Sequence, residues 1–145
     1  MRIRIVAVGK VKERAARELI DDYLGRIGRY CTVEERELKA APAGKLTAAI
    51  ARATAGATVV ALDERGQLQN SRKLAGALER LASRGKGIVA FVIGGADGLP
   101  QAVLDGATAR WSLSPLTFPH RLARLILAEQ VYRAMTILRG EPYDR

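Results

Sequence analysis

Three short segments of the sequence combine residue types that suit ligand binding. Residues 62–66 read Leu-Asp-Glu-Arg-Gly, residues 93–99 read Ile-Gly-Gly-Ala-Asp-Gly-Leu, and residues 112–119 read Ser-Leu-Ser-Pro-Leu-Thr-Phe-Pro. Glycines let a backbone approach a ligand without an intervening Cβ. The hydroxyls, prolines and apolar side chains of the third segment suit a loop that offers backbone hydrogen bonds to a flat, partly apolar ligand. The chemistry expected from the three together is binding of a nucleotide-like molecule.

Other chemistries are limited by what the sequence lacks. The glycines of 93–99 are not spaced as Gly-x-Gly-x-x-Gly, and there is no Gly-x-x-x-x-Gly-Lys-Ser/Thr phosphate loop. A plain tight turn is therefore an equal alternative for this segment. Cys31 and His120 are the only residues of their types, so no metal centre is expected. A catalytic triad would have to use His120, which can equally face solvent at the start of a helix.

The elements that must position these segments alternate between strands and helices. Hydrophobic periodicity predicts strands at 3–8, 32–39, 58–62, 88–93 and 111–113, and helices at 12–24, 45–55, 71–83, 100–107 and 119–138. This alternation predicts a single-domain α/β fold, a mainly parallel sheet with helices on both faces. The heavily charged strand 32–39 is expected at a sheet edge, and Asn70 or Ser71 as the N-cap of its helix. Because each of the three segments follows a strand, we expect them to meet where parallel sheets bind ligands.

Length and charge narrow the class of protein. The 145 residues suit one domain, with 139–145 as a short functional tail. The net charge of +9 favours a nucleic-acid partner through phosphate contacts, although a solvated, arginine-rich surface is an equal alternative. The apolar run at the N-terminus is too short for a signal peptide or a membrane span. A lone cysteine fits a reducing compartment, so the expected location is the cytoplasm.

The last predicted helix carries two apolar stripes. Leu122, Leu125 and Ile126 form one, and the other comprises Leu127, Val131, Met135 and Leu138. One stripe is enough to dock a helix on a sheet. The second stripe predicts a further partner, most simply a second copy of the chain. The alternative is a helix fully buried in its own core.

The chain resembles a known family in five segments. They are the start Ile5-Val-Ala-Val-Gly9, the segments 62–66, 91–99 and 112–120, and the tail Gly140-Glu-Pro-Tyr143. They are similar to the large-subunit ribosomal RNA pseudouridine N3-methyltransferases, minimal members of the SPOUT superfamily. The resemblance covers essentially the whole chain. It implies a C-terminal trefoil knot in the α/β fold, a homodimer, and S-adenosylmethionine held in the knot loops. The implied substrate is a pseudouridine in an exposed stem-loop of 23S rRNA in the assembled ribosome.

The resemblance also implies roles for individual residues. The cofactor contacts carried over are Leu62, Gly94, Leu113, Ser114, Pro115, Leu116, Thr117 and Phe118. We expect the tail residues Tyr143, Asp144 and Arg145 to be catalytic, with Tyr143 and Arg145 positioning the base over the cofactor of the other subunit. Asp144 stands where the family usually has a histidine, so it is considered as a proton acceptor.

Two rival functions are kept open at this point. The first is a non-catalytic ribosome-binding factor on the same fold, which the Asp144 departure favours. The second is a small nicotinamide-dependent reductase, which the missing dinucleotide fingerprint disfavours.

Overall fold

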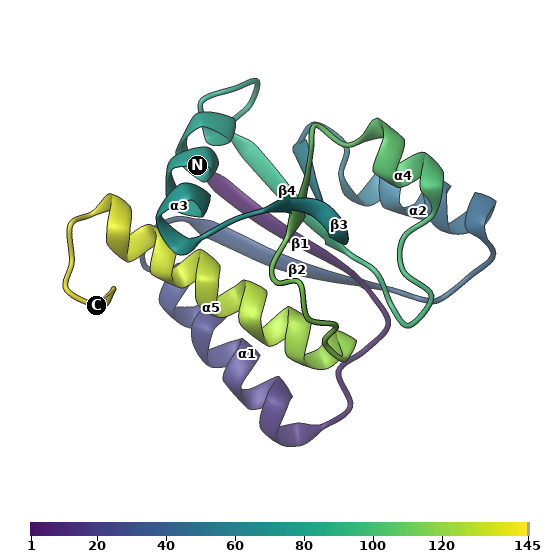
Figure 1. The fold of residues 1–145 in the computed structure, drawn as a ribbon, viewed down its shortest axis with the longest axis horizontal. Coiled ribbons are helices and arrows are strands. Elements are labelled where there is room, and N and C mark those ends of the chain that lie inside the picture. Colours follow the sequence, from purple (N-terminus) through teal and green to yellow (C-terminus); the bar gives the residue numbers. More distant parts are fainter. Residues whose placement is uncertain (145) are drawn as a thin grey trace.

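The computed structural model describes residues 1–144, which form one five-stranded parallel sheet in the order β2-β1-β4-β3-β5 (Figure 1). The strands are β1 (Arg2–Val8), β2 (Thr32–Leu38), β3 (Thr58–Leu68), β4 (Ile88–Ile93) and β5 (Ala109–Ser112). The helices are α1 (Arg14–Ile27), α2 (Ala43–Ala53), α3 (Ser71–Ala82), α4 (Gln101–Gly106) and α5 (His120–Leu138). The α/β architecture is therefore confirmed, whereas the trefoil knot stays a prediction.

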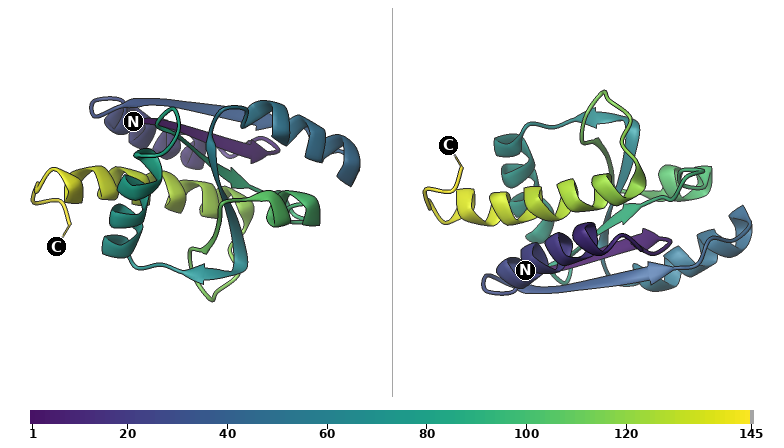
Figure 2. Two further views of the ribbon diagram at one scale, coloured as in Figure 1. Left: turned by 90° about the horizontal axis from the view of Figure 1, so that it is seen from above. Right: turned by 90° about the horizontal axis from the view of Figure 1, so that it is seen from below.

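Helices cover both faces of the sheet, as predicted. On one face, α1, α3 and α5 pack over a core that includes Ile5, Phe91 and Trp111. On the other face, α2 and α4 pack over Val6 and Val92. The alternation of core residues between the two faces follows the two-residue period of a strand. In Figures 1 and 2, α1 and α5 lie side by side along the first face.

The predicted edge position of the charged strand is also confirmed, because β2 pairs only with β1 within residues 1–144. The cap of α3 is Asn70, whose side chain accepts a hydrogen bond from the Lys73 backbone N–H. None of the helices in the described part of the chain is long and apolar enough to cross a bilayer.

The prediction that the third strand ends at Leu62 is wrong. β3 continues to Leu68, and Trp111 of β5 is paired with both Leu62 and Gln67, so residues 63–66 form an excursion between two paired stretches. The pairing resumes because Gly66 lies directly on the β5 backbone. A Cβ at Gly66 would stand 2.8 Å from the carbonyl of Arg110. The composition of 63–66 is typical of a turn, and only pairing across the sheet shows that the strand goes on.

Of the two apolar stripes predicted on α5, one packs on the sheet and the other is only partly free for a partner. Leu127, Val131 and Met135 are buried against the sheet, which confirms that this stripe docks the helix. Leu125 of the other stripe packs against the apolar cluster of α1 instead of facing outward. Leu122 is 39% exposed. The stripe is divided because α1 lies alongside α5 and covers one side of it.

A buried charged group, which the sequence pattern did not predict, ties α5 to the first two strands. The Arg124 side chain is 1% exposed and donates hydrogen bonds to Glu35 at 2.7 Å and to Glu37 at 2.6 Å. It also donates to the backbone oxygen of Gly9 at 3.1 Å. Arg17 of α1 donates to the same Glu35 carboxylate at 2.7 Å. The start of α5 is therefore held to the carboxyl ends of β1 and β2 by charge as well as by packing.

Replacing Arg124 by methionine is expected to lower the free energy of unfolding by about 3 kcal/mol, because two partly buried carboxylates lose the more deeply buried of their two guanidinium partners and keep only Arg17. Urea unfolding at fixed protein concentration measures the change. The matched control is Arg14→Met, since the Arg14–Glu18 pair has side chains 91% and 65% exposed. This control should change the stability by less than about 0.5 kcal/mol. Equal midpoints for the two variants would contradict the role of Arg124.

Candidate functional site

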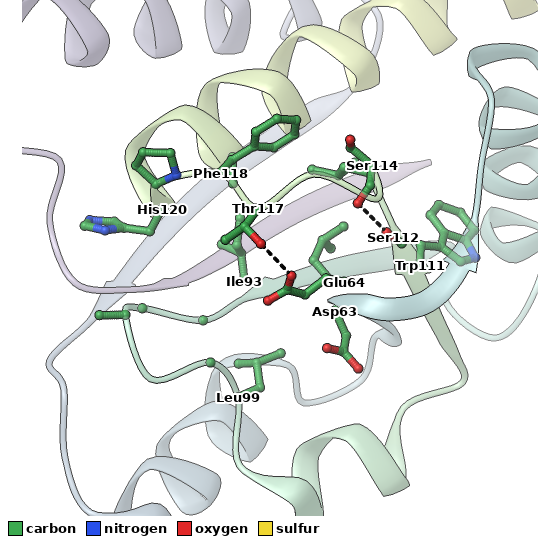
Figure 3. A pocket seen from close by; sticks show the side chains of 18 of the residues that line it. Asp63, Glu64, Ile93, Leu99, Trp111, Ser112, Ser114, Thr117, Phe118 and His120 are labelled. Carbon is green, nitrogen blue, oxygen red and sulfur yellow. Dashed lines mark hydrogen bonds between the residues drawn. The ribbon is translucent and has the colours of Figure 1, made fainter.

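A cavity of about 560 Å³ opens beside the excursion of β3 and the carboxyl ends of β4 and β5 (Figure 3). All three segments that the sequence singled out contribute to its walls, the first from the β3 excursion. The lining residues are Leu62, Asp63, Glu64, Ile93, Gly94, Gly95, Ala96, Gly98, Leu99, Leu104, Trp111, Ser112, Leu113, Ser114, Leu116, Thr117, Phe118, Pro119, His120 and Ala123. The expectation that these segments converge at one edge of the sheet is thus confirmed.

The glycine-rich segment is a tight turn and a cavity wall at once. Gly98 has a positive φ of 73°, and its N–H donates to the Gly95 oxygen at 3.1 Å. Gly94 lies on the far arm of this turn, where a Cβ would stand 2.6 Å from the carbonyl carbon of Gly98. A tight turn and a ligand-binding loop, the two alternatives left open for this segment, are therefore compatible. The turn closes only with a glycine at 94, and the backbone there faces the cavity without a side chain.

The segment 112–119 is held in shape by its own hydroxyls. The Ser112 hydroxyl donates to the backbone oxygen of Ser114 at 2.9 Å, and the Ser114 hydroxyl accepts from the Leu116 N–H at 3.0 Å. Across the cavity, the Thr117 hydroxyl donates to the Glu64 carboxylate at 2.9 Å (Figure 3). This last bond ties the segment to the β3 excursion, so two walls of the cavity are joined directly.

The structure brings together seven of the eight residues predicted to contact a cofactor. The seven that line the cavity are Leu62, Gly94, Leu113, Ser114, Leu116, Thr117 and Phe118. Pro115 is exposed and does not line it. Pro115 shapes the loop between Ser114 and Leu116 without facing inward. Binding by any of these residues stays a prediction.

Several cavity residues were not assigned a role from the sequence. Asp63 and Glu64 belong to a segment that was singled out, but their carboxylates had no predicted partner. His120 was expected to face solvent or cap a turn, whereas the structure places it in the cavity wall. Trp111 of β5 is 3% exposed, lines the cavity and packs on Phe91 at a ring separation of 5.9 Å. Its position on β5, opposite the excursion of β3, could have been found only from the sheet pairing.

The walls are mainly apolar, with a few polar groups that could fix the orientation of a ligand. Such a composition and volume are typical of small-molecule sites. Among residues 1–144, the lining includes two carboxylates and one imidazole but no lysine or arginine. Residues 1–144 contain no group of histidine, cysteine and carboxylate side chains that could hold a metal ion. The cavity is therefore suited to an organic ligand held by backbone groups and apolar contacts.

The tail residues lie away from this cavity. The Tyr143 hydroxyl donates to Glu129 at 3.2 Å, and its ring contacts Tyr132 at 4.7 Å between ring centres. The guanidinium of Arg133 stands 4.8 Å above the same ring. Burial, followed by interactions with Tyr23 and Glu129, raises the pKa of Tyr143 above its ordinary value. The phenol is therefore protonated at neutral pH, and it can donate a hydrogen bond but cannot act as a base.

Asp144 is engaged in ion pairs. Its carboxylate accepts from Arg133 at 3.1 Å and lies 3.4 Å from a guanidinium nitrogen of Arg72 on α3. The side chain is only 16% exposed. Arg145, the third residue predicted to be catalytic, lies outside the described residues.

The length of α5 separates the tail from the cavity of its own chain. His120 and Ala123 line the cavity at the start of the helix, while the tail follows its last residue, Leu138. The 19 residues of α5 span about 28 Å at the helical rise. In Figure 1 the C-terminus accordingly lies at the opposite end of α5 from β3 and β4. Tyr143 and Asp144 are not brought together with the predicted cofactor residues within one chain.

Two ribosomal RNA methyltransferases are similar to this chain over its full length. A ribosomal RNA large subunit methyltransferase H from Sorangium cellulosum is 57% identical over 143 residues, which cover 99% of each chain. A protein of the same name from Acetivibrio thermocellus is 41% identical, with 100% of both chains covered.

Solved structures with low identity share the fold. A probable methyltransferase from Bordetella pertussis superimposes with a TM-score of 0.61 at 18% identity, covering 92% of this chain and 94% of that one. The SpoU methyltransferase AviRb from Streptomyces viridochromogenes, solved in complex with the cofactor AdoMet, gives a TM-score of 0.52 at 12% identity. That alignment covers 97% of this chain and 59% of AviRb.

The family described as "Predicted SPOUT methyltransferase" matches residues 1–144, which is every residue of the fold described above. The α/β sheet, the cavity at its carboxyl edge and the full-length relatives agree with this match. The chain belongs to the SPOUT methyltransferase family.

Proposed function

We propose that the protein transfers a methyl group from S-adenosylmethionine to N3 of a pseudouridine in 23S rRNA of the assembled ribosome. The observation that carries this proposal is the cavity built by three segments at the carboxyl edge of the sheet, in a chain of the SPOUT family. The names of the relatives support a large-subunit rRNA as substrate. The net charge of +9 supports a phosphate-rich partner. Membership of this family leaves the reductase alternative without support.

The residues present fit S-adenosylmethionine. A volume of about 560 Å³ is adequate for a ligand of this size. The bare backbone at Gly94 and the loop 113–118 offer amide and carbonyl groups for the edge of an adenine ring. Apolar side chains such as Leu99, Leu113 and Phe118 offer contacts for its faces.

The bound cofactor would supply an electrophilic methyl group on a sulfonium. The work of the protein is then alignment, since an in-line displacement needs the attacking nitrogen, the methyl carbon and the sulfur on one line. The proton of N3 would leave to solvent water. The apolar walls around Trp111 exclude water, and charge dispersal in the transition state is favoured in a dry site. The Tyr143 phenol, which is protonated, is suited to hold the pseudouridine by donating a hydrogen bond.

The separation of tail and cavity supports a homodimer in which each tail completes the site of the other chain. The surface around the tail has the composition of an interface. Tyr23, Tyr30, Tyr132 and Tyr143 gather there, and arginine side chains contact all four rings. Tyrosine and arginine are enriched at protein interfaces. A two-fold arrangement would give two equivalent composite sites.

The ion pairs of Asp144 bear on its role in this proposal. Proton acceptance would require the carboxylate to give up its contacts with Arg133 and Arg72. As paired, Asp144 is better suited to anchoring the tail so that Tyr143 is presented in a fixed position.

The proposed reaction is tested by incubating the purified protein and methyl-labelled S-adenosylmethionine with ribosomes that lack the methyl group. The expected result is one labelled nucleotide in 23S rRNA, located by mass spectrometry at N3 of a pseudouridine. Ribosomes that already carry the methyl group serve as the control and should take up no label. Cofactor binding without any transfer would instead favour the non-catalytic ribosome-binding factor.

Gly94→Ala is expected to weaken S-adenosylmethionine binding at least tenfold. The added Cβ would stand 2.6 Å from the Gly98 carbonyl carbon, so the turn must move and the wall of the cavity with it. Calorimetric titration measures the affinity. Gly44→Ala is the matched control, because a Cβ there meets nothing within 4 Å on α2, which lies apart from the cavity. Unchanged affinity in Gly94→Ala would show that the cofactor binds elsewhere.

A subunit-mixing experiment tests whether the tail acts on the partner chain. Deletion of residues 143–145 should abolish turnover but spare cofactor binding. Gly94→Ala should lose most of its turnover when the cofactor concentration is kept well below the weakened dissociation constant. Unfolding and refolding the two inactive chains together should restore roughly a quarter of wild-type activity, because half the dimers then hold one intact composite site. If tail and cavity worked within one chain, the mixture would stay inactive.

A further inference from the structure

Asp63 differs from Glu64, the other carboxylate that lines the cavity, in having no partner among the described residues. Its side chain is half-buried, and within residues 1–144 its carboxylate has no hydrogen-bond or ion-pair partner. A ligand that covers this carboxylate must replace its hydrating water with a donor, because burying an unpaired carboxylate is costly. The position is therefore suited to a ligand that brings its own hydrogen-bond donor.

The charge of the cavity is opposite to that of the chain as a whole. The sequence has 24 lysine and arginine residues against 15 aspartate and glutamate residues. The lining nevertheless holds Asp63 and Glu64 and no lysine or arginine. A recess lined by one sign of charge concentrates ligands of the other sign. This cavity favours a ligand with a cationic group.

Glu64 has a different task from its neighbour. Its carboxylate accepts the 2.9 Å hydrogen bond from Thr117, which joins the β3 excursion to the segment 112–119. In Figure 3 the carboxylates of Asp63 and Glu64 both lie between the glycine-rich turn and that segment. Gly66 fixes the excursion that carries them by lying on the backbone of β5. Glu64 is therefore occupied within the protein, and Asp63 is the free acceptor.

We propose that Asp63 is a specificity-determining residue that binds the α-ammonium group at the amino-acid end of the cofactor. This inference rests on the proposed function. S-adenosylmethionine carries two cationic groups, a sulfonium and an ammonium. The ammonium has three N–H donors, as a lysine side chain does, whereas the sulfonium has none. The ribose hydroxyls and the adenine amino group are also donors, but they are neutral. The ammonium is therefore the donor that matches both the unpaired acceptor and the negative charge of the wall.

Calorimetric titration with three probes tests the assignment in the wild type and in Asp63→Asn. The probes are S-adenosylmethionine, S-adenosylhomocysteine, which keeps the ammonium but not the sulfonium, and 5′-methylthioadenosine, which lacks the amino-acid end. Asp63→Asn should bind the first two more weakly by a similar factor, roughly tenfold, as expected for the loss of a charge-assisted hydrogen bond. Its affinity for 5′-methylthioadenosine should not change.

Asp97→Asn is the matched control, because Asp97 lies in the glycine-rich turn but is exposed and does not line the cavity. It should bind all three probes as the wild type does. Three outcomes would overturn the inference: no weakening in Asp63→Asn, weakening of S-adenosylmethionine alone, or equal weakening of 5′-methylthioadenosine. A wild-type protein that binds none of the probes would refute the proposed function itself.

Discussion

The cavity depends on two places where backbone lies directly against backbone at the carboxyl edge of the sheet. Gly94 lies on Gly98, and Gly66 lies on the backbone of Arg110 and Trp111. At either position a side chain would stand closer than 3 Å to main-chain atoms, which cannot move away as a flexible side chain would. The first contact closes the glycine-rich turn. The second lets β3 leave the sheet at Asp63 and return, which places two carboxylates in the cavity.

The remaining packing serves to hold the start of α5 beside this edge. Arg124 binds the carboxylates of β2 and the backbone end of β1; it lies one turn after His120 and directly after Ala123, which both line the cavity. Hydrogen bonds from a buried charge to several partners fix the orientation of the helix, which apolar packing alone does not. The helix is thereby fixed at its cavity end, while its other end carries the tail about 28 Å away. One helix thus links the cavity of one chain to the residues proposed to complete the cavity of another.

Much of this arrangement could be predicted from the sequence, because it follows from local patterns. Alternating strands and helices indicated a parallel sheet, the charges of residues 32–39 indicated its edge, and the rule for parallel sheets indicated where the three segments meet. Nearly all the cofactor residues implied by the family resemblance do line the cavity, with Pro115 as the exception. These features needed no knowledge of which distant residues touch.

What could not be predicted depends on contacts between segments far apart in the chain. The continuation of β3 past Leu62 arises from its pairing with β5, and the covering of Leu125 arises from α1. Arg124 has the same appearance in the sequence as any exposed helical arginine, since its carboxylate partners are nearly 90 residues away. The separation of Tyr143 from the cavity likewise follows only from the direction of α5.

A crystal structure with bound S-adenosylhomocysteine would test most directly whether the three segments form the cofactor site. The account predicts electron density for the adenosine between the Gly94 turn and the segment 113–118, with the amino-acid end directed toward Asp63. Density on another face of the molecule, with this cavity filled by the protein's own side chains, would contradict it.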